Sequence, residues 1–223
     1  MKTLMNFLMC MALAIFAVHT GDYSAHFLHP DLLTSNEVVL GAFVSFANLG
    51  NIEEQTPNPP GVRRLGVIAV QDLLATTIDW PKLSEINADM QVTVALPLVV
   101  GKTVATIDPA DNSCEITTES QGMRFYQSYK NGVAFEIAGW GATQMKELKK
   151  FVNTGCIFFA EMHDGQIKVI GSKLNPIVLT QKAMTGKKGG DKRGYTLSGD
   201  NDSFMFEPPI YPTTLALPGM TNV

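Results

Sequence analysis

The period of the apolar pattern changes at Gly155. Before this residue, four apolar side chains recur at the spacing of one helical face: Met145, Leu148, Phe151 and Val152. The spacing predicts an amphipathic helix over 143–152, with Thr143 as its N-cap and with lysines in its last turn, where the helix dipole favours positive charge. After Gly155 the apolar residues alternate with a period of two, which predicts β-strands.

A β-meander is predicted to follow the helix. Residues 156–161 have the composition of a buried strand, and 166–170 alternate as a strand with one wet face. Asp164-Gly165 between them is a strong hairpin signal. A further strand over 177–181 leads into a glycine- and lysine-rich loop, 185–194, from which the chain returns as another strand.

Strand-like segments punctuated by turns also precede the helix. They cover 61–70, 91–100, 102–108, 114–119, 122–129 and 133–138. Asn131-Gly132, between the last two, is the preferred sequence of a type I′ turn and predicts a hairpin tip there. We therefore expect a mainly β fold, a β-sandwich or barrel-like domain with one short flanking α-helix.

Prolines divide the chain into three parts. An apolar N-terminal segment with a linker covers 1–56 and includes a predicted strand over 38–46, a β domain covers 57–200, and a Pro-rich extended arm covers 201–223. The first 18 residues have a basic start and an apolar middle, as in a secretory signal peptide. An apolar arm that faces a partner is the alternative for this segment.

Composition argues against several classes of function. The 223 residues carry 17 basic and 21 acidic side chains, a net charge of −4, whereas a nucleic-acid-binding domain should be markedly basic. The three cysteines, Cys10, Cys114 and Cys156, have no metal-type spacing. Two isolated core thiols, at 114 and 156, are predicted, with a disulfide between them as the alternative.

Motifs for catalysis, cofactors or metals are fragmentary. Gly101-Lys102-Thr103 matches only the end of a phosphate-binding loop, and the glycines of 186–194 lie between strands rather than before a helix. His26 and His29 are two histidines beside a proline, and 200–202 lacks the glycine and distal glutamate of a calcium loop. We therefore expect no enzyme, no cofactor and no metal site.

Several glycine and turn patterns carry a family resemblance across residues 61–211. They are Gly61–Leu65 after a proline stretch, 144–153, Asp164-Gly165, 169–172, Thr185–Lys187 and 190–197. In these the chain resembles tail-tube-like virion structural proteins of Bacteroidetes phages. The resemblance implies a tail-tube-type domain that closes into a ring with copies of itself, stacks, and contacts other virion proteins in a phage tail.

The predicted interface between subunits is charged. Its candidate residues are the basic side chains Lys187, Lys188, Lys192 and Arg193, with Asp200 and Asp202 as acidic partners on the next subunit. Glu53 and Glu54 are alternative acidic partners. A solvated hairpin tip is the alternative for the basic loop.

A second function class stays open at this stage. A secreted or periplasmic β-sandwich that binds a carbohydrate or another ligand would use exposed aromatic residues as a platform. The candidates are Trp80, Tyr126, Tyr129 and Trp140, for which core packing is the alternative. The mature N-terminus separates the two classes, because export predicts a start near Gly21 and the virion predicts an intact Met1 or the loss of Met1 alone.

Overall fold

The computed structural model describes residues 61–188 and 191–220. They belong to the second of two units into which the chain divides, Met1–Gln55 and Thr56–Val223. The signal-like segment, the strand predicted over 38–46, and Cys10, His26 and His29 lie outside the described residues.

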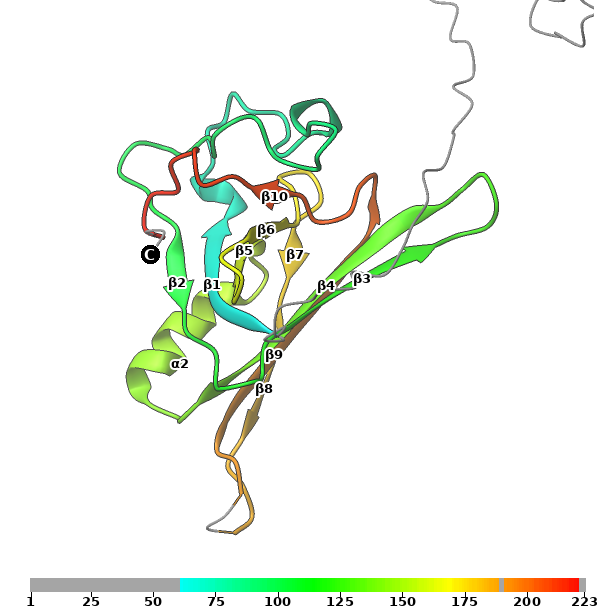
Figure 1. The fold of residues 1–223 in the computed structure, drawn as a ribbon. Helices are drawn as coiled ribbons and strands as arrows, with labels where there is room; N and C mark the ends of the chain where they lie inside the picture. Colours follow the sequence, from blue (N-terminus) through cyan, green and yellow to red (C-terminus); the bar gives the residue numbers. More distant parts are fainter. Residues whose placement is uncertain (1–60, 189–190, 221–223) are drawn as a thin grey trace, which may run out of the picture. The chain divides into compact units, whose positions relative to one another are not determined.

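Two antiparallel sheets form the domain (Figure 1). The six-stranded sheet has the order β10-β6-β5-β1-β2, with β7 pairing to β5, and the four-stranded sheet has the order β3-β4-β9-β8. The strands of the six-stranded sheet are β1 Val62–Ala69, β2 Ala105–Ile107, β5 Gly155–Met162, β6 Ile167–Ile170, β7 Ile177–Val178 and β10 Ile210–Tyr211. Those of the four-stranded sheet are β3 Glu115–Gln121, β4 Ser128–Ala138, β8 Thr180–Met184 and β9 Gly194–Phe204.

The helical elements are short. Within the described residues there is one α-helix, α2 Ala142–Leu148, and it continues as the 3₁₀ turn η5 Lys149–Phe151. Two further 3₁₀ turns are η3 Val70–Asp72 and η4 Leu83–Glu85. The prediction of a mainly β, sandwich-like fold with one short helix is confirmed.

The main core lies between the two sheets. Alternate residues of β1 and β5, such as Leu65 and Phe158, pack against Phe135 of β4 and Leu197 of β9. Leu148 of α2 closes this core from one end. The alternating apolar side chains of these strands therefore face the core, as the sequence pattern predicted. The other face of the four-stranded sheet is turned outward.

A second core covers the opposite face of the six-stranded sheet. The rings of Trp80, Phe159 and Tyr211 pack together there, with centroids 5.8–6.3 Å apart. The covering layer is the chain between η3 and β2 together with the C-terminal segment, which places Leu217 and Met220 in this core. Since β5 is covered from both sides, its central residues, 156–161, are all buried.

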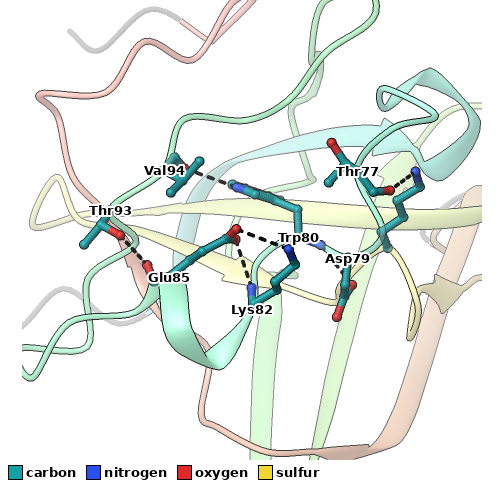
Figure 2. Close-up of polar contacts among 8 residues, drawn as sticks. Thr77, Asp79, Trp80, Lys82, Glu85, Thr93 and Val94 are labelled. Atoms are coloured by element: carbon teal, nitrogen blue, oxygen red, sulfur yellow. Dashed lines mark hydrogen bonds and ion pairs between the residues drawn. The ribbon is translucent and has the colours of Figure 1, made fainter.

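Figure 2 shows polar contacts that hold the covering layer in place. The indole Nε1 of Trp80 donates to the carbonyl of Val94 at 3.2 Å, and the hydroxyl of Thr93 donates to the carbonyl of Glu85 at 2.9 Å. Lys173, from the loop before β7, donates its ammonium hydrogens to the carbonyls of Leu74 and Thr77. These bonds satisfy backbone groups that no strand ladder pairs.

Two strand predictions before β4 need correction. The strand predicted over 91–100 is wrong, because this segment runs as irregular chain with isolated bridges such as Ile86↔Val92 and Leu73↔Leu98. Its buried residues, Val92 and Leu96, cover the second core instead of joining a ladder. The apolar residues of this segment belong to a loop that covers the core. Of the strand predicted over 102–108, only β2 forms.

The hairpin predicted at Asn131-Gly132 is also wrong. Strand β4 passes through both residues, and the turn lies at 122–127. Gly132 is needed for another reason: a Cβ atom there would stand 2.6 Å from the Thr117 hydroxyl of neighbouring β3. Close approach of two strands, rather than a turn, therefore explains this glycine.

The helix begins one residue earlier than predicted and shows a narrower apolar face. Gly141, not Thr143, is its N-cap, and the Gln144 amide accepts from the Gly141 N–H at 3.0 Å and donates to the Ala138 carbonyl at 2.9 Å. Of the four apolar residues only Leu148 is buried, whereas Met145 and Val152 are half exposed, at 52% and 50%.

The strand predicted over 177–181 is divided between the sheets. β7 pairs with β5 of the six-stranded sheet, and after Leu179 the chain crosses to form β8 of the other sheet. The segment predicted as the C-terminal arm starts inside β9 and continues through β10, at the edge of the six-stranded sheet.

Both described cysteines are free and buried. Cys114 lies beside Gly61, before the first residue of β1, and Cys156 pairs with Ala69 at the other end of that strand. Eight residues of extended chain separate these positions by roughly 26 Å. The predicted isolated core thiols are thus confirmed, and burial raises their pKa values to about 12 for Cys114 and about 11 for Cys156.

Candidate functional site

The four-stranded sheet has exposed strands at both of its edges. Its edge strands β3 and β8 each pair on one side only within the described residues. Most side chains of both strands are exposed. An unpaired strand edge presents a row of backbone donors and acceptors, which a protein must charge, cover or pair.

The two edges carry opposite charges on the outer face of this sheet, the face turned away from the main core. The strand registers place Glu115 and Glu119 on this face of β3, opposite Ala134 and Lys130 of β4. On β8 the same face carries Lys182, which lies opposite Thr196. One edge is therefore acidic and the other basic.

Two hairpins extend this sheet at its opposite ends (Figure 1). The β3–β4 hairpin turns at 122–127, beside the end of β9, where Tyr129 pairs with Phe204. The β8–β9 hairpin turns at the other end, beside Ala138 of β4, which pairs with Gly194. We call the first turn the aromatic tip and residues 185–194, of which 189–190 lie outside the described residues, the basic loop.

Asp191 organises the basic loop. One of its carboxylate oxygens accepts from the backbone N–H groups of Lys187 and Lys188, at 2.6 and 2.9 Å. The side chains of both lysines are exposed. The loop thus turns its backbone donors inward, onto one carboxylate, and presents two ammonium groups to solvent.

The other two basic candidates contact the body of the domain. Lys192 forms an ion pair with Glu136 of β4 at 3.0 Å, and the Arg193 guanidinium lies 6.0 Å from the ring centre of Trp140. Trp140 in turn packs edge-to-face on Tyr195. Lys192 and Arg193 therefore fix the base of the loop, while Lys187 and Lys188 form its charged surface.

The two acidic candidates lie toward the other end of β9. Asp200 pairs with Lys130, and the hydrogen bond between them raises the pKa of Lys130. The Asp202 carboxylate accepts from the neighbouring Ser203 hydroxyl at 3.2 Å. Seven residues of strand separate Arg193 from Asp200, roughly 23 Å. The acidic and basic candidates do not meet within one chain.

Two shallow hollows mark the outer face. One, of about 280 Å³, lies between the base of the basic loop and the end of β4, and is lined by Glu136, Lys192 and Thr196 among others. The other, of about 310 Å³, crosses the middle of the sheet over Gly132 and Ser198. Within 61–188 and 191–220 no group of three or more potential ligand side chains is close enough to hold a metal ion.

The aromatic residues considered for a ligand platform do not share a surface. Trp80 is buried in the second core at 1% exposure, behind the six-stranded sheet. Trp140 and Tyr129 pack against the main core, and Tyr126 stands alone among the four at the aromatic tip, 79% exposed.

No family model, curated protein or solved structure matches this chain. In the part of the chain that is described, no helix is long and apolar enough to cross a membrane.

Sequence reasoning missed the aromatic tip. Met123, Phe125 and Tyr126 were assigned to a strand, because they are apolar and aromatic residues in a run. In the structure they are the exposed tip of a hairpin, at 79%, 86% and 79% exposure. The signal in the sequence that could have indicated the turn is Gly122, and in the structure this residue has a φ of +109°.

Proposed function

We propose that this protein is a non-enzymatic structural subunit that closes into a ring with copies of itself. The observation that carries the proposal is the four-stranded sheet, whose two edge strands pair on one side only within the described residues and carry opposite charges. Pairing β8 of one copy with β3 of the next would use both edges at once. Head-to-tail contacts of this kind form closed rings when the rotation between neighbours permits closure.

The direction of the strands suits such a contact. Each neighbouring pair in the sheet is antiparallel, so β3 and β8 run in opposite directions. A rotation about an axis along the strands preserves their direction. Copies related in this way would therefore bring β8 and β3 together as an antiparallel pair, and the alternation would continue around the whole ring.

Charge would favour this pairing over contacts between like edges. Glu115 and Glu119 of β3 would face Lys182 of β8, whereas a β3–β3 contact would oppose glutamates. Opposite charges across strands contribute roughly 0.2–1 kcal/mol per pair, and like charges are destabilising. The small individual value is multiplied by the number of subunits in a ring.

The resemblance to tail-tube-like virion proteins supports a specific setting for such a ring. We propose that the ring is a component of a phage tail, where it contacts other virion proteins and reads no nucleic-acid sequence. The exposed lysines of the basic loop, Lys187 and Lys188, would then meet acidic side chains such as Asp200 and Asp202 of a copy in an adjoining ring, because the loop and these acids lie at opposite ends of the sheet.

Light scattering coupled to size-exclusion chromatography, followed by electron microscopy of the full chain, tests the ring. We expect a cyclic oligomer of defined size for the wild type and a loss of oligomer for Glu119→Lys and for Lys182→Glu. The double variant exchanges the two charges and should recover the oligomer. Asp89→Lys, an exposed charge change in the covering layer, is the matched control and should assemble normally.

A wild-type chain that stays monomeric at all concentrations contradicts the proposal. Single variants that assemble as the wild type does would show that the β3 and β8 edges are not the contact.

A further inference from the structure

The aromatic tip exposes three large apolar side chains in one turn. Met123, Phe125 and Tyr126 are 79%, 86% and 79% exposed, so none of them contributes to either core. The turn that presents them is tight, because the Tyr126 N–H donates to the Met123 carbonyl at 2.9 Å. Phe125 has a φ of +74°, which is unfavourable for a bulky residue. Exposed apolar residues in a strained turn indicate a contact outside the domain.

The end of this hairpin carries no acidic residue. From Ser120 to Tyr129 the one charged side chain is that of Arg124. Its guanidinium lies 4.8 Å from the ring centre of Phe125. The acid that comes next along β3, Glu119, is paired across the strands with Lys130. Three residues of strand separate this pair from the turn, so the acid-free end is roughly 10 Å long.

The hairpin also continues past its neighbour in the sheet. Strand β9 ends at Phe204, which pairs with Tyr129, and the residues from there to the turn have no β9 partner (Figure 1). Met205, the next residue of the chain, is 77% exposed and adds a further apolar side chain at this level. The aromatic tip therefore projects beyond the sheet with its apolar side chains in solvent.

We propose that the aromatic tip inserts into the surface of a lipid bilayer, at the boundary between headgroups and acyl chains. This contact goes beyond the proposed ring and does not require it. Segments that bind at this boundary bury apolar residues by about 5–10 Å, which matches the acid-free length of the hairpin. Aromatic side chains with a polar end, such as Tyr126, are favoured at this depth. Arg124 is placed to pair with lipid phosphates.

The shape of the tip favours lipid over a second copy of the chain. A projecting tip needs either an apolar hollow or a surface that closes around it. The two hollows of the outer face contain charged side chains, Glu136 and Lys192 in one, and Glu115 and Asp200 in the other. A fluid bilayer needs no preformed hollow. If several copies form a ring, their tips would reach one membrane together and raise the affinity.

Flotation of the full chain with phosphatidylcholine vesicles tests the insertion. We expect the wild type to float, and Phe125→Ser/Tyr126→Ser to partition at least about tenfold less strongly. Ile78→Ser/Leu174→Ser is the matched control and should float as the wild type does, because it removes two apolar residues of similar exposure, 75% and 69%, from other loops. Phosphatidylserine should raise the binding by less than about tenfold, since the tip has one positive charge.

A single tryptophan at the tip reports insertion directly. The emission of Phe125→Trp should shift to shorter wavelength on vesicles, and lipids brominated on their acyl chains should quench it. Ile78→Trp should show neither effect. Trp80 and Trp140 are present in both variants and give the same background. An unchanged Phe125→Trp spectrum on vesicles that carry the protein would overturn the insertion.

Three other results would also overturn it. The first is a wild type that does not float. The second is binding that the tip variant retains, which would place the contact elsewhere, such as in the apolar part of residues 1–18. The third is loss of the oligomer by the tip variant without lipid, which would make the tip a contact between copies.

The ring and the insertion fail separately. Lys182→Glu, which should lose the ring, keeps its tip and should still bind vesicles. A wild type that is monomeric but floats would refute the ring alone. A wild type that forms rings but does not float would refute the insertion alone.

Discussion

The six-stranded sheet and the four-stranded sheet differ in how much of each strand is covered. In the first, β5 lies between two apolar layers, and Ile157, Phe158 and Phe159 are fully buried. In the second, β4 and β9 bury one face, while their outer face carries Thr196, Ser198 and Asp200. The buried residues of the first sheet should therefore contribute most of the stability of the domain. The second sheet presents a polar face, two edges and two hairpins to solvent.

This division has a physical reason. A strand buried on both faces needs a covering layer, and here the irregular chain between η3 and β2 provides it. A strand edge that is used for assembly must instead stay accessible, and charge protects it from wrong partners in the meantime. On the proposed ring, mutations should therefore affect folding in the first sheet and association in the second.

The largest expected effect is in the six-stranded sheet. Phe159→Ala removes a fully buried ring that packs on Trp80 and Tyr211, and should lower the free energy of unfolding by about 3–5 kcal/mol. Thr196→Ala, on the outer face of the other sheet, should stay within about 0.5 kcal/mol. Urea unfolding measures both, and equal values would contradict the contrast between the sheets.

Two adjacent residues at the end of helix α2 should show the same contrast between a buried and an exposed side chain. Leu148 is buried at 4%, so Leu148→Ala should lower the free energy of unfolding by about 2–5 kcal/mol through the cavity that it leaves. Lys149 is exposed, and Lys149→Ala should change the unfolding free energy by less than about 0.5 kcal/mol. A similar loss for the two variants in thermal or urea unfolding would mean that the helix packs by another face.

A smaller effect is expected at alkaline pH from the two thiols of the main core. Burial raises their pKa values to about 12 and about 11, so the folded state keeps protons that the unfolded chain loses above about pH 9. Stability should be fully present below that pH and should fall by about 1 kcal/mol per thiol near pH 10.

Urea unfolding at pH 8 and pH 10 measures the thiol effect, with Cys114→Ala/Cys156→Ala as the reference. The variant should lose less between the two pH values than the wild type does. A thiol reagent at pH 8 should modify neither cysteine until the chain unfolds. Rapid modification of Cys114 or Cys156 in the native protein, assigned by peptide mapping so that Cys10 is not counted, would show that the core is open.

The smallest effect on stability is expected at the basic loop. Lys187→Glu/Lys188→Glu should leave the thermal midpoint nearly unchanged, because both side chains are exposed. It should slow assembly and weaken its dependence on salt. Light scattering at two or more salt concentrations measures this, and unchanged kinetics would leave the loop as a solvated tip.

Local sequence patterns were sufficient for elements that short-range chemistry decides. The Asp164-Gly165 turn forms as predicted: Gly165 takes a φ of +83°, and the Gln166 N–H donates to Asp164 Oδ1 at 2.9 Å. The core strands β1 and β5 also follow their apolar pattern. Among the site residues, the sequence placed Lys187 and Lys188 on an exposed loop between strands, where they lie.

Only the tertiary structure decided which apolar or glycine residues serve a turn, a strand or a covering layer. Gly132 is required by the nearness of Thr117, a residue of another strand, and the aromatic tip was hidden in a run of residues that favour strands. Likewise, 91–100 is apolar because it covers the second core, not because it joins a ladder. Strand propensity is read from residues that are close in the sequence. These roles depend instead on neighbours that the fold brings together from elsewhere in the chain.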